Sequence, residues 1–241
     1  MEVYGLTDVG SVRSENQDAF ATGRLADDVL YAVVCDGMGG PGGGGIASRL
    51  AADLFAERME KQYRPGMPEA SLFHLMESAV DAANVGIFDK AAENPDLAGM
   101  GTTLVAVVID RENAVAVHVG DSRLYRLEVN TLEQITTDHS VVQEMIDRGQ
   151  LTEEQARSHP RKHFITRAIG VEGTVRCEFD TFTVSLDTRL LLCTDGLTNM
   201  LSDEKIEGLL RDGSPETVPG ALVDAANAAG GEDNITAVIF A

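Results

Sequence analysis

Several aspartates stand where an apolar run ends, a position that suits metal binding. Asp36 and Asp195 each end such a run and are followed by a glycine, Asp121 follows Val119-Gly120, and Asp233 stands just before another run. A carboxylate at the end of a buried strand is held by a rigid scaffold yet faces a cleft, and a following glycine lets the backbone approach a ligand closely. Converging carboxylates of this kind form a hard-cation site suited to Mg²⁺ or Mn²⁺.

The same pattern also has a simpler explanation. Asp and Gly are common turn residues, and Asp110 likewise ends an apolar run although we assign it no function. Composition and spacing alone therefore leave a metal site and a set of ordinary turns equally open.

The elements that must position these aspartates are strand-length apolar runs. The runs are apolar at successive positions, so we expect both faces of their strands to be covered. Val115, Val117 and Val119 alternate with smaller or polar residues, the period of another strand, and residues 110–113 have the composition of a hairpin turn. The continuous runs are residues 30–35, 104–109, 190–193 and 235–240.

Helical periodicity appears in three blocks, at residues 46–55, 72–87 and 218–229. The helices and strands do not alternate strictly, which favours antiparallel sheets with helices packed outside them over a doubly wound parallel sheet. Between about residues 138 and 170 the apolar pattern weakens, and we interpret this stretch as an exposed excursion. Within it, Thr152-Glu-Glu-Gln155 predicts a short helix opened by a capping box.

Charge and length exclude several classes of protein. The chain has 241 residues, and its 19 Lys+Arg and 39 Asp+Glu give a formal charge of −20. Such a polyanion disfavours binding to nucleic acid or to an anionic membrane surface. We expect a single domain over residues 1–241, with no segment composed like an interdomain linker, and we favour a monomer.

The termini and cysteines indicate the compartment. The N-terminal residues lack the pattern of a secretory signal, and no apolar run approaches the ~20 residues of a membrane span. We therefore expect a soluble, cytoplasmic protein. Cys35, Cys177 and Cys193 fit neither a disulfide framework nor a CxxC zinc site, so we expect three buried free thiols.

A series of motifs resembles the metal-dependent protein phosphatases of the PPM class, also called type-2C Ser/Thr phosphatases. Each motif is weak alone, but together they occur in the family's order and span nearly the whole chain. The segments that carry the resemblance are Thr7–Asp18 with its Arg and Asn-Gln-Asp, Cys35-Asp-Gly-Met-Gly-Gly40, Gly99–Thr103, Val119-Gly-Asp-Ser-Arg123, Asp138-His-Ser140, Leu192-Cys-Thr-Asp-Gly196 and Glu232-Asp-Asn-Ile-Thr236.

The resemblance implies an α+β fold, a four-layer α-β-β-α sandwich of two antiparallel sheets flanked by helices. It implies that Asp36 bridges two Mn²⁺ or Mg²⁺ ions and that the carbonyl of Gly37 binds one of them. Asp195 and Asp233 would complete this binuclear pair.

Further roles follow from the same resemblance. Asp18 would act on the metals directly or through water, and Asp121, with Asp195, matches the position of a third, weaker ion in bacterial members. Arg13 would bind the substrate phosphate. The implied substrates are proteins phosphorylated on serine or threonine, hydrolysed by a metal-activated water without a phosphoenzyme.

The sequence departs from the family's pattern after the Asp-Gly-Met-Gly-Gly motif. Where the family has a His and then a Gly-Glu pair, this chain has Pro41 and Gly44-Gly45. We interpret residues 39–45 as a flexible turn before a helix that begins near Ala47-Ser48. The departure leaves Asp36 and Gly37 untouched but changes residues that would support the metal centre.

The roles of the histidines and of Arg123 are less clearly indicated by the sequence than those of the aspartates. His163, with His159, lies in the region that family members use as a flap, at about residues 145–170, and could touch substrate or simply be solvated. His118 is expected to be a satisfied core residue, and His139 could orient groups near the cleft or pack a loop. Arg123 is expected to form a structural ion pair.

Two other functions compete with the phosphatase. One is a pseudophosphatase that binds a phosphoprotein without turnover, for which only the altered glycine run argues. The other is a two-metal phosphodiesterase or nuclease, which the acidic charge disfavours. A Cys-x₅-Arg phosphatase motif, a P-loop, a G-x-S-x-G motif and an H-E-x-x-H motif are all missing from the sequence.

Overall fold

Two antiparallel sheets form the centre of the molecule. We describe them from a computed structural model, in which residues 1–40, 42–129 and 131–241 are described; the departure at Pro41 therefore lies outside the described residues. One sheet is five-stranded, with the order β1-β11-β10-β7-β8. Its strands are β1 (Val3–Asp8), β7 (Arg123–Glu128), β8 (Thr131–Gln134), β10 (Arg189–Cys193) and β11 (Ile235–Phe240).

The second sheet has the strand order β2-β3-β5-β6-β9, with one further short strand, β4, paired to β3. Its strands are β2 (Asp18–Ala26), β3 (Val29–Met38), β4 (Gly101–Thr102), β5 (Leu104–Asp110), β6 (Asn113–Val119) and β9 (Glu178–Thr183). The predicted hairpin is present, because Asp110 pairs with Asn113 across β5 and β6.

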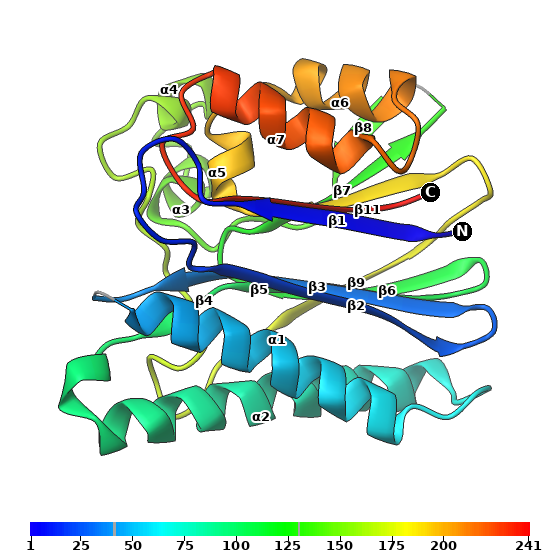
Figure 1. The fold of residues 1–241 in the computed structure, drawn as a ribbon, viewed down its shortest axis with the longest axis horizontal. Coiled ribbons are helices and arrows are strands. Elements are labelled where there is room, and N and C mark those ends of the chain that lie inside the picture. The colour runs from blue at the N-terminus through cyan, green and yellow to red at the C-terminus, as the bar shows by residue number, and fades with distance from the viewer. Residues whose placement is uncertain (41, 130) are drawn as a thin grey trace.

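Helices cover the outer face of each sheet (Figure 1). The helices α1 (Gly43–Gln62) and α2 (Glu69–Glu93) pack on the second sheet, and α6 (Asp203–Asp212) and α7 (Val218–Ala228) pack on the first. The predicted α+β fold is therefore confirmed as a four-layer α-β-β-α sandwich. None of the helices in the described part of the chain is long and apolar enough to cross a bilayer.

Strand β3 shows why the predicted strands are apolar at successive positions. Tyr31 and Val33 belong to the buried cluster beneath α1 and α2, whereas Leu30, Ala32 and Val34 belong to the cluster between the two sheets. Alternate side chains of a strand point to opposite faces. Both faces of this strand are thus buried in apolar cores, as expected.

The remaining elements gather at the end of the sandwich opposite the two termini (Figure 1). They are the 3₁₀ turn η1 (Pro95–Leu97) and the short helices α3 (Val141–Asp147), α4 (Glu153–Arg157) and α5 (Asp195–Thr198). The capping box predicted for α4 is confirmed: Thr152 Oγ1 accepts from the Gln155 amide at 3.3 Å, and Gln155 Oε1 accepts from the Thr152 amide at 2.9 Å.

Two expectations about this part of the molecule were wrong. Helix α1 begins at Gly43, so Gly43 to Gly45 form its first turn instead of a flexible turn before Ala47-Ser48. A Cβ on Gly44 would lie 2.6 Å from the Gly37 carbonyl oxygen, so close backbone packing requires glycine there.

The second wrong expectation concerns the thiol of Cys177. Cys35 and Cys193 are buried as expected, but Cys177 is only half-buried. The reason is that Cys177 precedes an edge strand instead of lying inside a central one.

Candidate active site

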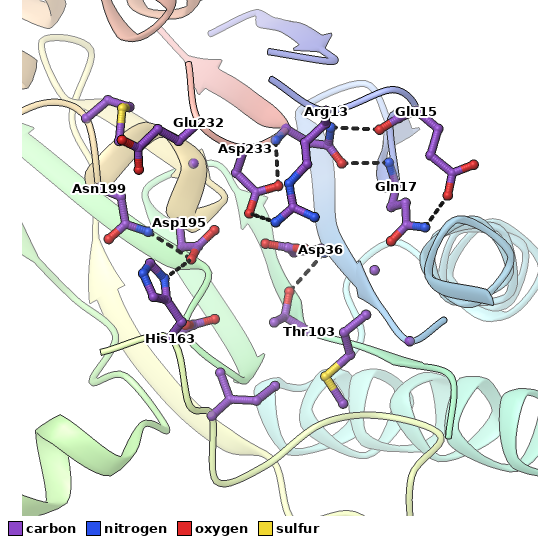
Figure 2. A pocket seen from close by; sticks show the side chains of 18 of the residues that line it. Arg13, Glu15, Gln17, Asp36, Thr103, His163, Asp195, Asn199, Glu232 and Asp233 are labelled. Carbon is purple, nitrogen blue, oxygen red and sulfur yellow. Dashed lines mark hydrogen bonds and ion pairs between the residues drawn. The ribbon is translucent and has the colours of Figure 1, made fainter. Parts of the chain in front are cut away.

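A pocket of about 700 Å³ opens at the end of the sandwich. Strand ends from both sheets converge on it, so residues far apart in the sequence share one wall. Four of the predicted aspartates line it with Arg13, Gly37 and His163, and Figure 2 shows Arg13 on the side of Asp233 and His163 on the side of Asp195. The lining aspartates are Asp36, Asp121, Asp195 and Asp233.

Asp18, the fifth predicted aspartate, lies directly behind this wall. It is paired with Asp36 across the antiparallel strands β2 and β3, and directly opposed residues project on the same face of a sheet. Only 3% of its surface is exposed. Burial, together with the charges of Asp195 and Asp233, raises the pKa of Asp18 to about 7, although two hydroxyl hydrogen bonds oppose that rise.

Those hydroxyls come from the opposite sheet. Thr194 Oγ1 and Thr236 Oγ1 donate to Asp18 Oδ2 at 2.9 and 2.7 Å, which fixes the carboxylate between the two sheets. The other oxygen, Oδ1, is buried without a hydrogen-bond partner. An unpartnered buried carboxylate oxygen is costly, so this atom is suited to a cation or to a water molecule bound to one.

Gly37 lines the pocket where three backbone segments are closely packed. A Cβ at this position would lie 2.1 Å from the Gly44 carbonyl oxygen and 2.5 Å from that of Gln17. The Gly37 amide donates to Gln17 O at 3.1 Å. Glycine at this position therefore lets the first turn of α1 pack against the end of β3, whereas the predicted approach of its backbone to a ligand stays a prediction.

Asp195 begins the short helix α5 after β10. Asn199 Nδ2 donates to its Oδ2 at 2.9 Å, and His163 Nδ1 lies 3.9 Å from the same oxygen (Figure 2). Burial alone would raise the pKa of Asp195, but the interactions with His163, Asp36 and Asn199 hold it below its usual range. A Cβ on Gly196 would lie 2.0 Å from Asn234 O, so glycine again permits the close approach.

Asp121 follows a backbone clamp at the end of β6. His139 holds Gly120 on both sides, because its amide donates to Gly120 O at 2.9 Å and its Nδ1 accepts from the Gly120 amide at 3.1 Å. Burial, with the nearby Asp195 and Asp138, raises the pKa of Asp121 well above its usual range. His139 thus orients a group at the pocket, one of the two roles expected for it.

Asp233 and Arg13 form an ion pair at the pocket entrance. Arg13 Nη2 lies 2.7 Å from Asp233 Oδ2, and the two side chains are 55% and 38% exposed. Arg13 is the only arginine among the described residues that line the pocket. Its guanidinium keeps donors free toward the cavity, since a single contact uses only part of the planar fork.

The pocket lining has more acidic than basic side chains, which bears on whether it can hold divalent cations. The described lining carries Glu15 and Glu232 as well as the four aspartates, against Arg13 and His163. Burial and the neighbouring Asp18 and Asp195 raise the pKa of Asp36 well above its usual range. Bound cations stabilise such an excess of carboxylate, so the donor set and the unpartnered Asp18 Oδ1 both fit them.

Outside this pocket, three side chains of residue types that bind metals lie with their ligand atoms within 4.8 Å of one another. They are His118, His139 and Glu178. Arg167 already occupies this group, with Nη1 3.0 Å from His139 Nε2 and 2.5 Å from Glu178 Oε1. Burial, His118 and Arg167 lower the pKa of His139 to about 4. A resident guanidinium and carboxylate already balance each other's charge, so we assign no metal here.

The other sequence expectations have mixed outcomes. Arg123 forms the expected ion pair, with Nη2 2.7 Å from Asp138 Oδ2. His118 is buried but only half satisfied, since Nε2 lies 2.9 Å from Thr137 O while Nδ1 has no partner. His159 accepts from the Arg161 amide and is not part of the pocket lining.

Sequence reasoning missed the polar residues that hold the aspartates. Thr194, Thr236, Asn199 and Asn234 all contact site residues or their loops. Each lies within a few residues of a predicted aspartate, and Thr194, Asn234 and Thr236 also belong to the motifs that carry the family resemblance. Which of them reaches a carboxylate depends on the packing of one sheet against the other.

Comparisons with known proteins agree with this geometry. The sequence profile described as protein phosphatase 2C matches residues 11–218. The chain is 39% identical over 236 residues to the serine/threonine phosphatase stp of Listeria welshimeri, an alignment that covers 97% of this chain and 92% of the relative.

Solved structures share the whole fold. The Mycobacterium tuberculosis serine/threonine phosphatase PstP/Ppp superimposes with a TM-score of 0.90 at 35% identity, over 99% of this chain and 97% of that one. A structure of the catalytic domain of the serine threonine protein phosphatase PstP in complex with two manganese ions has a TM-score of 0.87 at 33% identity, over 99% and 96% of the two chains.

The chain belongs to the protein phosphatase 2C family. It is a protein serine/threonine phosphatase by class, as the resemblance in the sequence had implied.

Proposed function

We propose that this protein hydrolyses phosphoserine and phosphothreonine in phosphorylated proteins, using two Mn²⁺ or Mg²⁺ ions held by its aspartates. One observation carries the proposal: buried and half-buried carboxylates from both sheets line one pocket beside an arginine with free donors. The manganese ions of the related catalytic domain support the choice of metal.

The ligands follow from the donor set. Asp36, Asp195 and Asp233 would hold the two ions with the carbonyl of Gly37, and Asp18 would contribute through its unpartnered Oδ1. Asp121 would hold a third ion with help from Asp195. When bound, the ions would lower the pKa of a coordinated water and neutralise charge on the phosphoryl oxygens.

The protein's own contribution is positioning. Arg13 would bind two oxygens of the phosphate through its guanidinium fork and align phosphorus with the attacking water. The bond from phosphorus to the seryl or threonyl oxygen then breaks, and inorganic phosphate and a free hydroxyl remain. We propose direct attack by water without a phosphoenzyme; the described pocket lining holds no cysteine for a Cys-x₅-Arg mechanism.

The excursion at about residues 145–170 would form part of the substrate-binding surface. Its residue His163 reaches the pocket on the side of Asp195 (Figure 2). We propose that His163 contacts the phosphorylated segment of the substrate. A His163→Gln variant should therefore raise KM for a phosphothreonine peptide more than it lowers kcat.

The proposed function is tested by turnover of a phosphothreonine peptide with Mn²⁺, with a chelator, and with Mn²⁺ on the Asp36→Asn variant. Asp110→Asn is the matched control, since Asp110 also ends a strand but bonds Tyr63 far from the pocket. We expect chelator and Asp36→Asn each to abolish turnover while Asp110→Asn keeps it.

Two outcomes would contradict the proposal. A folded wild-type protein that binds Mn²⁺ but leaves the peptide intact would instead fit phosphoprotein binding without catalysis. Preferential hydrolysis of bis-nitrophenyl phosphate over the phosphopeptide would instead indicate a phosphodiesterase.

A further inference from the structure

The loop that carries Arg13 belongs to neither sheet. Residues 9–17 run between β1 and β2 without regular secondary structure, and they lie against the segment 230–234 that carries Asp233. We propose that Asn234 is a positioning residue that holds this loop, and so places Arg13 over the pocket. The role of Arg13 in phosphate binding rests on the proposed function; the anchoring of the loop does not.

The Asn234 side chain makes three hydrogen bonds, all of them to the loop backbone. Its Oδ1 accepts from the Gln17 amide at 2.8 Å. Its Nδ2 donates to Val9 O at 2.9 Å and to Glu15 O at 3.0 Å. Asn234 is only 6% exposed, so these bonds are shielded from water and both ends of the loop are held by one amide.

The surrounding contacts fix the loop in the same position. The Ser11 amide donates to Gly231 O at 2.8 Å, and a Cβ on Gly10 would lie 2.2 Å from Asp233 O. The loop backbone is thus packed directly onto the residue that precedes Asn234. Only a glycine with a positive φ, here 80°, permits that contact.

Arg13 depends on this anchorage because its own side chain makes few contacts that would hold it in place. It is more than half exposed, and its one ion pair is with Asp233. A long, exposed side chain loses conformational entropy when it binds a ligand, and a mobile loop would add to that loss. Anchoring of Val9, Glu15 and Gln17 pre-organises the arginine before phosphate arrives.

The test compares Asn234→Ala with Arg13→Ala and with the double variant, all loaded with Mn²⁺. Alanine is chosen because an aspartate would add a charge that repels phosphate by itself. Asn84→Ala is the matched control: Asn84 is a buried asparagine whose amide also bonds loop backbone, at Glu172 O and the Gly170 amide, away from Arg13. Calorimetry measures the affinities for Mn²⁺ and for inorganic phosphate.

We expect Asn234→Ala to keep Mn²⁺ binding and to weaken phosphate binding about tenfold, a loss typical of supporting residues. Arg13→Ala should weaken it at least as much, and Asn234→Ala should add nothing in the Arg13→Ala background. KM for a phosphothreonine peptide should rise more than kcat falls, while Asn84→Ala leaves phosphate affinity unchanged. Unchanged phosphate affinity in Asn234→Ala, or a loss that simply adds to that of Arg13→Ala, would overturn the proposal.

Hydrogen exchange separates this inference from the proposed function and does not depend on the variant's folding. In the wild-type protein the Gln17 amide should exchange slowly, as its bond to Asn234 requires. In folded Asn234→Ala the amides of residues 10–17 should exchange faster, while those of β11 stay protected. A Gln17 amide that exchanges freely in the wild type would refute the anchorage, whatever the protein hydrolyses. If the Gln17 amide exchanges slowly in a wild-type protein that binds no phosphate, the anchorage is supported and the proposed function is contradicted.

Discussion

Asp18 on β2 and Asp36 on β3 are directly opposed in the antiparallel pairing of these strands. A buried and a half-buried carboxylate therefore project on the same face of one sheet, where the charge of Asp18 raises the cost of ionising Asp36. The pKa of both groups is raised, above all by burial. A cation bound beside this pair would relieve the repulsion between the two carboxylates.

The first prediction is that the metal-free protein becomes less stable as the pH rises from about 4 to about 7. The folded pKa of Asp18, about 7, lies above its ordinary value of 3.8, so in this range the folded state binds more protons than the unfolded state. Stability is then lost as those protons leave. Urea unfolding in chelator at several pH values measures the slope, and saturating Mn²⁺ should flatten it. The Asp110→Asn control should keep the slope, whereas Asp18→Asn should reduce it.

The second prediction is that Asp36→Asn stabilises the metal-free protein while removing its response to metal. Loss of one buried carboxylate relieves the repulsion, so the free energy of unfolding at pH 8 should rise by about 1–2 kcal/mol. Mn²⁺ should bind the folded wild type and raise its Tm by mass action. In the Asp36→Asn variant that increase should largely disappear. A less stable metal-free variant would show that Asp36 makes a structural contact that outweighs the repulsion.

The third prediction concerns the hydroxyl that holds Asp18. Thr236→Val keeps the shape of the side chain but removes the donor 2.7 Å from Asp18 Oδ2. Stability should fall by about 1–3 kcal/mol, and Mn²⁺ affinity should fall about tenfold or more. Thr136→Val is the matched control, because buried Thr136 accepts from the Leu124 amide and contacts no site aspartate. Equal Mn²⁺ affinities in the two variants would argue against a role for the Thr236 hydroxyl.

The fourth prediction separates two adjacent glycines at the start of α1. A Cβ on Gly45 would meet nothing closer than 3.7 Å, so Gly45→Ala should stabilise the protein by about 0.5–1 kcal/mol through helix propensity. A Cβ on Gly44 would lie 2.5 Å from Gln17 Oε1 and 2.6 Å from Gly37 O. Gly44→Ala should therefore lower both Tm and Mn²⁺ affinity. Similar Tm values for the two variants would contradict the close packing of α1 against β3.

Much of the architecture could be predicted from the chain alone. The central strands β3, β5, β10 and β11 are buried on both faces, so their residues form continuous apolar runs that are recognisable in the sequence. The edge strand β2 was not predicted from the apolar pattern, because most of its side chains are only partly buried. The first turn of α1 was mistaken for a flexible turn because glycine has low helix propensity, which tertiary packing against Gly37 overrides.

The candidate aspartates are visible in the sequence, because a carboxylate that ends an apolar run is a local feature, and the order of the motifs identifies the family. Which of these aspartates meet depends on tertiary packing. Asp36 and Asp195 come to one pocket while Asp110, equally placed at a strand end, lies elsewhere. Thr236 and Asn234 acquire their partners more than two hundred residues away along the chain. Such contacts arise from the packing of two sheets against each other, and no local spacing of residues encodes them.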